Sequence, residues 1–168
     1  SYVYISGQYF RESDLLLRAL KEISSDRDDV YELALTTLMK KETFVMATYQ
    51  GRFASLKYPW HILDVMNLMF AQLKSYRGTN VVVRDNVVIE GPVWLEDNVK
   101  IFENTKIVGP CYIGKNTVIG NNNIIRESHI GANCVTGFTT DITRSYIGDD
   151  CWFHSNYIGD SVLEGNVS

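Results

Sequence analysis

The sequence predicts an α+β segment over residues 1–78 and a parallel β-helix over residues 79–168. In the first part, apolar residues recur at helical spacing in three stretches. In the second part, a large branched aliphatic residue recurs every six residues, which is typical of a hexapeptide β-helix. The chain has 168 residues, 45% of them apolar, and is long enough to form one domain or two small ones with a hydrophobic core.

Three helices, a short strand and a hairpin are expected in the first part. Residues 2–5 are β-forming, and two further β-forming runs at 43–49 and 52–56 are separated by a glycine, which predicts a hairpin. Ser13 caps the first predicted helix, and Pro59 opens the third. The apolar residues that share one face of each helix are Leu16, Leu20 and Ile23, then Tyr31, Leu35 and Leu38, and last Ile62, Met66, Met69 and Leu73.

The six-residue period defines the predicted β-helix. Its aliphatic positions are Val83, Ile89, Leu95, Ile101, Ile107, Ile113, Ile119 and Ile125. The residue four positions after each of these is mostly small, as at Val93, Thr105 and Thr117. Three six-residue sides make one triangular turn, and successive turns stack about 4.8 Å apart through backbone hydrogen bonds. The aliphatic side chains therefore point inside, and the segment is long enough for about five turns.

The period shortens after Ile125, with steps of five residues that begin at positions 125, 142 and 153. Each short step is expected to bend or bulge a corner of the coil. Glycine and asparagine residues, such as Gly114, Gly120 and Asn121, are expected to supply the corner conformations.

The three cysteines follow the same period. Cys111, Cys134 and Cys151 each lie four residues after a repeat position, and their spacing matches neither a CxxC metal site nor a dense disulfide framework. They are interpreted as small inward-facing residues, with reactive or ligand thiols as the alternative. No metal site is predicted.

The composition disfavours nucleic-acid and membrane partners. Sixteen Lys and Arg against 20 Asp and Glu give a net charge of -4, and no segment carries a basic stripe. No apolar run approaches the roughly 20 residues needed to span a bilayer. We therefore expect a cytoplasmic protein.

Two motifs resemble those of a known family. Tyr-Pro-Trp-His-Ile-Leu at residues 58–63 precedes the hexapeptide repeats, and His-Ser-Asn-Tyr-Ile-Gly-Asp-Ser at residues 154–161 fits His-x-x-Tyr-aliphatic-Gly-Asp. The chain thereby resembles sugar-1-phosphate nucleotidyltransferases fused to a left-handed β-helix, above all the bifunctional N-acetylglucosamine-1-phosphate uridyltransferase/glucosamine-1-phosphate acetyltransferase type. The resemblance implies that residues 1–78 are the C-terminal part of an α/β nucleotidyltransferase domain. It also implies a homotrimer through the β-helix, and a sugar phosphate or nucleotide sugar as ligand.

The resemblance also implies three site residues. His154 is the general base for acetyl transfer from acetyl-CoA to an amino-sugar-1-phosphate, Tyr157 contacts the sugar phosphate, and Arg126 binds the phosphate. An imidazole suits the first role because its pKa lies near neutrality, and a guanidinium suits the last because its donors match a phosphate. Structural roles stay open for all three: a corner cap, a surface aromatic residue and an ordinary charged residue, respectively. His61 and His129 carry no motif and are interpreted as structural or solvent-facing.

Departures from the family pattern leave further hypotheses open. Val30 stands where the family has a sugar-binding glutamate, and Ser55 where it has a metal-binding aspartate, so Mg²⁺ is a cofactor only if nucleotidyl transfer is retained. The sequence lacks the glycine-rich loop and the later coils of the family, so a fragment that is inactive alone is expected. The alternatives are a non-catalytic nucleotide-sugar-binding, regulatory or assembly subunit, and a nucleotidyltransferase whose β-helix is only structural.

Overall fold

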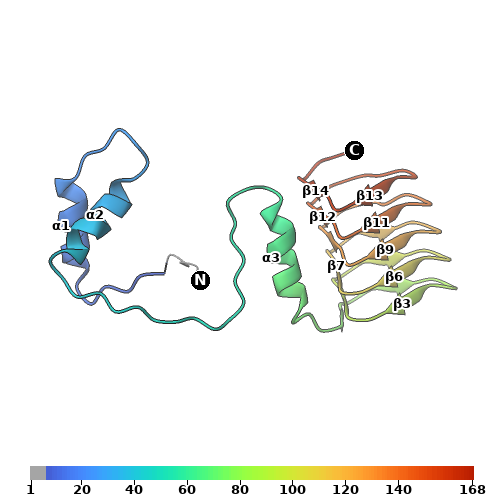
Figure 1. Cartoon of the computed structure of the whole chain (residues 1–168). Coiled ribbons are helices and arrows are strands. Elements are labelled where there is room, and N and C mark those ends of the chain that lie inside the picture. The colour runs from blue at the N-terminus through green and yellow to red at the C-terminus, as the bar shows by residue number, and fades with distance from the viewer. Residues whose placement is uncertain (1–6) are drawn as a thin grey trace. The chain divides into compact units, whose positions relative to one another are not determined.

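The computed structural model describes residues 7–168 and divides the chain into two units, Ser1–Gly51 and Arg52–Ser168. Its helices are α1 (Ser13–Glu22), α2 (Val30–Met39) and α3 (His61–Phe70) (Figure 1). The three predicted helices are therefore confirmed. The division falls earlier than the change of sequence pattern near residue 78, because α3 belongs to the same unit as the β-helix.

In the first unit, α1 and α2 pack on each other through small residues. Ala19 and Ala34 are buried together with Leu38. Alanine side chains let two helix backbones approach closely, so few large residues are needed to fill the contact. The partly buried side chains around this contact are Phe10, Leu15, Leu16, Leu20 and Ile23, which include the apolar face predicted for the first helix.

The hairpin predicted at residues 43–49 and 52–56 is wrong. Residues 43–57 form no strand and leave large apolar side chains in solvent, with Val45 89% exposed. A strand needs a neighbouring strand for its backbone hydrogen bonds, and the described part of the chain places none beside this segment. Residues 2–5 lie outside the described residues. Within residues 7–75 the structure holds no sheet, so the α/β nucleotidyltransferase part implied by the resemblance is not present there.

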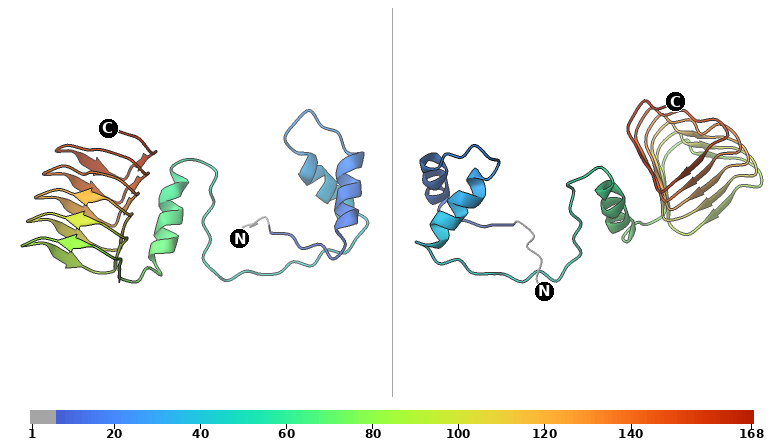
Figure 2. Two further views of the ribbon diagram at one scale, coloured as in Figure 1. Left: turned by 180° about the vertical axis from the view of Figure 1, so that it is seen from behind. Right: turned by 45° about the horizontal axis from the view of Figure 1, so that its top comes forward.

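From residue 76 the chain forms a parallel β-solenoid of about five turns, as the six-residue period predicted (Figure 2). The strands form a six-stranded sheet (β1-β4-β7-β10-β12-β14), a three-stranded sheet (β2-β5-β8) and a five-stranded sheet (β13-β11-β9-β6-β3). Successive strands rotate through the three sheets as far as β10, and beyond β8 the third side continues through the isolated bridges Val118–Val135 and Val135–Trp152. The strands are β1 (Tyr76–Arg77), β2 (Val82–Val83), β3 (Val88–Glu90), β4 (Val93–Leu95), β5 (Lys100–Ile101), β6 (Lys106–Val108), β7 (Cys111–Ile113), β8 (Val118–Ile119), β9 (Ile124–Arg126), β10 (His129–Ile130), β11 (Asp141–Thr143), β12 (Tyr146–Ile147), β13 (Tyr157–Gly159) and β14 (Val162–Leu163).

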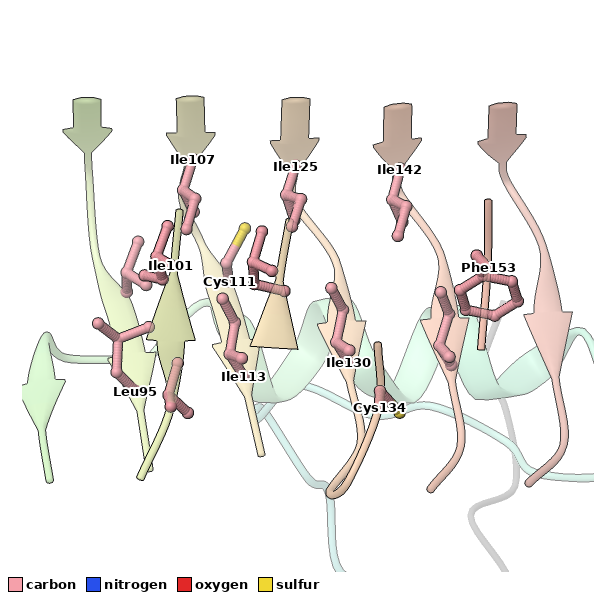
Figure 3. Close-up of a cluster of buried hydrophobic side chains, with 14 of the residues drawn as sticks. Leu95, Ile101, Ile107, Cys111, Ile113, Ile125, Ile130, Cys134, Ile142 and Phe153 are labelled. Atoms are coloured by element: carbon pink, nitrogen blue, oxygen red, sulfur yellow. The ribbon is translucent and has the colours of Figure 1, made fainter. Parts of the chain in front are cut away.

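The interior of the solenoid is a stack of the residues that carry the period. Isoleucines of neighbouring turns lie in register along each sheet, as Figure 3 shows for Ile107, Ile125 and Ile142. The fully buried isoleucines are Ile101, Ile107, Ile113, Ile119, Ile125, Ile130, Ile142 and Ile147. The three cysteines are free and buried among them, which confirms that they are small inward-facing residues. Burial raises the pKa of Cys111 and Cys134 to about 11, so both thiols stay protonated at neutral pH.

Asparagine supplies the left-handed conformation at one edge of the solenoid. Asn98, Asn116 and Asn133 have φ of 62°, 61° and 57°, which asparagine tolerates better than most residues. Their side chains form a ladder: Asn98 Nδ2 donates to Asn116 Oδ1 at 3.0 Å, and Asn116 Nδ2 donates to Asn133 Oδ1 at 3.0 Å. The role expected for Gly114, Gly120 and Asn121 is corrected, because none of the three has φ in this region. Glycine is required at position 114 because a Cβ would lie 2.6 Å from the backbone N of Ala132.

A buried serine closes the corner at each of the first two shortened steps, Ser128 after β9 and Ser145 after β11. After β9 the chain turns at Glu127, with φ 47°, and continues into the fully buried Ser128. Ser128 Oγ donates to Arg126 O at 2.6 Å and accepts the backbone N–H of Ser145, in the next turn, at 3.1 Å. The missing residue therefore makes this corner tighter. It causes no bulge in the strand before it, because β9 pairs with β11 over all three of its residues.

The outer face of the six-stranded sheet carries an aromatic stack. The His129 ring lies between those of Tyr112 and Tyr146, with centroids 4.7 and 4.5 Å away. Helix α3 runs along this side of the solenoid, contacts β12 and buries Met66 and Phe70 (Figure 1). His129 is therefore structural, and burial lowers its pKa.

Acidification is expected to destabilise the protein through His129. Its folded-state pKa lies below the ordinary value of about 6.5, so the unfolded chain binds more protons in this range. The stability that His129 contributes is complete above about pH 6.5 and falls as the pH drops toward the lowered pKa. Thermal unfolding of the protein and of His129→Gln at about pH 7.5 and pH 5 measures this effect. The difference in Tm between the two proteins should shrink on acidification, and a difference that is independent of pH contradicts the prediction.

Substitution at Asn116 is expected to separate backbone strain from the ladder. Asn116→Ala loses the ladder bonds and places a Cβ-bearing residue without a polar side chain at positive φ, so the free energy of unfolding should fall by about 1–3 kcal/mol. Asn116→Gly loses the same bonds but accepts the conformation, so its loss should be smaller. Urea denaturation of both variants checks this order, and equal losses contradict it.

Candidate functional site

The three residues assigned from the sequence lie on the outside of the solenoid. Arg126 ends β9, Tyr157 begins β13, and His154 lies on the corner just before β13. Strand β11 pairs with both β9 and β13 and so separates Arg126 from Tyr157. The candidate site therefore occupies one sheet and its adjoining corner, and the strand register fixes the spacing of its residues.

The guanidinium of Arg126 is already paired with a carboxylate. Its Nη2 donates to both side-chain oxygens of Asp141, each at 2.8 Å, and the two side chains are partly buried. A phosphate would therefore bind beside an anion. The sequence analysis missed Asp141, although the strand register places it: Asp141 stands opposite Ile124, two residues before Arg126 on the neighbouring strand.

Tyr157 is 68% exposed and stands opposite Asp141 in the pairing of β11 with β13. Its ring leans over Gly159, where a Cβ would lie 2.5 Å from Tyr157 Oη, so the glycine of the motif makes room for the phenol. The aspartate of the motif serves an ion pair: Arg144 donates from Nε and Nη2 to the Asp160 carboxylate, both at 2.7 Å. This hydrogen bonding by Arg144 lowers the pKa of Asp160.

His154 lies exposed beside Trp152, a residue that the sequence analysis did not single out. The centroids of the two rings are 5.9 Å apart and their planes are tilted by 34°. Both side chains point outward because Phe153 between them is buried in the core. A shallow hollow is lined by Trp152, Phe153, His154, Asn156 and Ser168. Within residues 7–168 no group hydrogen-bonds the imidazole of His154, so its nitrogens are available to a ligand.

A buried polar network holds the turn next to His154. Asn123 is fully buried, and its Nδ2 donates to Thr136 Oγ1 at 2.8 Å and to Gly137 O at 3.1 Å. Its Oδ1 accepts the backbone N–H of Thr140. Gly137 lies against His154, because a Cβ at this glycine would be 3.3 Å from His154 Nδ1. The network therefore shapes the surface from which the imidazole projects.

Comparison with known proteins adds one positive finding. Residues 92–127, about a fifth of the chain, match the family model described as bacterial transferase hexapeptide (six repeats). The matched residues form turns of the solenoid and include Arg126. The repeats and the solenoid together fit a left-handed β-helix of the acyltransferase type, and they indicate activity of the acyl- or acetyltransferase kind. A comparison with curated proteins gave no match.

Residues 7–168 contain no group of three or more His, Cys, Asp and Glu side chains placed to hold a metal ion. None of the helices in this range is long and apolar enough to cross a membrane.

Removal of the Asn123 side chain is expected to destabilise this part of the solenoid. Asn123→Ala leaves the buried Thr140 N–H without its partner and removes one of the two hydrogen bonds of the Thr136 hydroxyl, which still accepts from Gly120 N–H. A buried group that stays unsatisfied costs about 1–3 kcal/mol. Asn121→Ala is the matched control. The exposed Asn121 side chain donates to Glu103 at the surface, so its removal should change stability by less than about 0.5 kcal/mol. Urea denaturation compares the two variants, and equal effects would show that the network contributes nothing.

Proposed function

We propose that the β-helix transfers an acetyl group from acetyl-CoA to the amino group of an amino-sugar-1-phosphate. The observation that carries this proposal is the exposed imidazole of His154, within the motif at residues 154–161, on a solenoid whose repeats match those of bacterial transferases. Imidazole is the side chain that most often serves as a general base.

His154 acts as the general base in this proposal. The amine of the sugar attacks the thioester carbonyl carbon, a C–N bond forms, and the C–S bond breaks. The imidazole accepts the proton that the amine loses, and the departing sulfur of coenzyme A is then protonated. Because no described group hydrogen-bonds the ring, neutral His154 has a free lone pair for this proton.

Arg126 and Tyr157 bind the sugar phosphate in this proposal. Arg126 donates to Asp141 only from Nη2, which leaves Nη1 for a phosphate oxygen. The exposed phenol of Tyr157 offers a further donor on the same sheet. Asp141 holds the guanidinium in place between the two strands and partly offsets its charge.

A homotrimer belongs to the same proposal. Val88 and Ile124 are exposed on the outer face of the five-stranded sheet, where Tyr157 also lies, and this face is a suitable surface for association. Nucleotidyl transfer and its Mg²⁺ are not part of the proposal. Val30 begins α2 and Ser55 lies in the segment without strands, and neither side chain is a carboxylate that could hold the ion.

A second candidate is a non-catalytic assembly subunit. The ion pair between Arg126 and Asp141 favours it, because the carboxylate offsets the charge of the guanidinium without any phosphate. The version in which a degenerate nucleotidyltransferase half binds a nucleotide sugar has less support, because residues 7–75 hold no sheet.

Release of the coenzyme A thiol from acetyl-CoA, in the presence of glucosamine-1-phosphate, tests acetyl transfer directly. We expect turnover by the protein, and a fall in kcat of about 10²–10⁴-fold in His154→Ala, because general-base catalysis contributes this much. His61→Ala is the matched control. His61 Nδ1 accepts the backbone N–H of Lys57 at 3.1 Å and has no role in the proposed site, so its loss should leave kcat unchanged.

Unchanged turnover in His154→Ala would refute the role of His154. Absence of turnover in the unsubstituted protein, with intact folding by circular dichroism, would favour the assembly subunit.

A further inference from the structure

We infer that Trp152 is the surface on which the sugar ring of the acceptor stacks. This inference rests on the proposed acetyl transfer. It states that the acceptor sugar binds on the side of His154 where Trp152 lies. It adds to the site a specificity-determining residue that lies outside the motif at residues 154–161.

Trp152 differs from the other two tryptophans of the chain in its ring contacts. Trp94 stacks on Tyr76 with centroids 4.3 Å apart, and Trp60 stacks on Tyr58 at 4.8 Å. Trp152 is 55% exposed, and within residues 7–168 its one ring neighbour is the tilted imidazole of His154. Its indole face is therefore open to a ligand.

The backbone holds Trp152 in a fixed position. Trp152 forms a parallel bridge with Val135 in the preceding turn, and its N–H donates to Val167 O at 2.8 Å. The two neighbours in the same outer row of the solenoid, Val118 and Val135, are small aliphatic residues. A large aromatic side chain occurs in this row where it adjoins His154, which favours a role tied to that histidine.

The chemistry of the acceptor fits this surface. A general base must approach within about 2.6–3.2 Å of the proton it removes, so the sugar that carries the amine must lie directly beside His154. A pyranose ring has an apolar face of C–H groups, which packs well on the electron-rich face of an indole. Asn156 lines the same hollow, and its amide can bond the hydroxyl groups at the edge of the ring. In this arrangement the Trp152 indole packs on the face of the sugar, the His154 imidazole approaches its amine, and the Asn156 amide bonds its hydroxyl groups.

Calorimetric titration with glucosamine-1-phosphate tests the inference through binding. We expect Trp152→Phe, which keeps an aromatic face, to bind within about threefold of the unsubstituted protein, and Trp152→Ala to bind about tenfold more weakly. Trp152→Leu keeps apolar bulk without a ring and should resemble Trp152→Ala. Trp60→Ala, which removes an exposed tryptophan remote from His154 in the sequence, should bind normally.

Steady-state kinetics supply a second readout. In Trp152→Ala the KM for the amino-sugar phosphate should rise about tenfold, while the KM for acetyl-CoA stays unchanged. Equal affinity of all Trp152 variants for glucosamine-1-phosphate overturns the inference and leaves the proposed function intact. A lower mass of Trp152→Ala in light scattering, with unchanged affinity, also overturns it and identifies a subunit contact. Absence of both binding and turnover in the unsubstituted protein refutes the proposed function itself.

Discussion

The structure depends on the stacking of a branched aliphatic side chain on the same position of the next turn. Ile107, Ile125 and Ile142 stand in register on neighbouring strands. The other two sides repeat this aliphatic contact, except that Thr136 and Phe153 follow Ile119 on the side of the three-stranded sheet. Burial of these side chains requires that equivalent positions of neighbouring turns lie side by side. The parallel hydrogen bonds between turns hold the strands in this register, so the two interactions stabilise each other. The same register determines which outward-facing residues are neighbours, and it therefore also sets the spacing of the residues in the candidate site.

The candidate site lies in the part of the solenoid where the interior departs from the simple repeat. The corner after β9 is shortened and closed by Ser128, and a buried network links Asn123, just before β9, to Thr136 and Thr140 of the next turn. Polar groups in a buried turn specify one backbone path because each must find its partner. His154 projects from the turn that packs on this network, so its position is set by buried groups that a ligand never touches.

The sequence predicted the solenoid well because one strong interaction, burial every six residues, determines its whole pattern. It misassigned the left-handed corner conformation to Gly114, since close packing against Ala132 and a left-handed turn both favour glycine in a sequence. The hairpin at residues 43–56 failed because β propensity is local, whereas pairing needs a partner strand. Asp141 was missed as the partner of Arg126 because the shortened corner moves the register between these turns to 17 residues.

Hydrogen exchange of backbone amides, followed by mass spectrometry, tests most directly whether the interior stack holds the protein together. The structure predicts slow exchange for the turns between β4 and β12. Each strand there is paired on both sides in its sheet, except β8, which has β5 on one side and a single bridge to Val135 on the other, and the aliphatic residues are buried. It predicts fast exchange for residues 43–57, which form no strand. Strong protection of residues 43–57, or exchange in the central turns as fast as in that segment, would contradict the account.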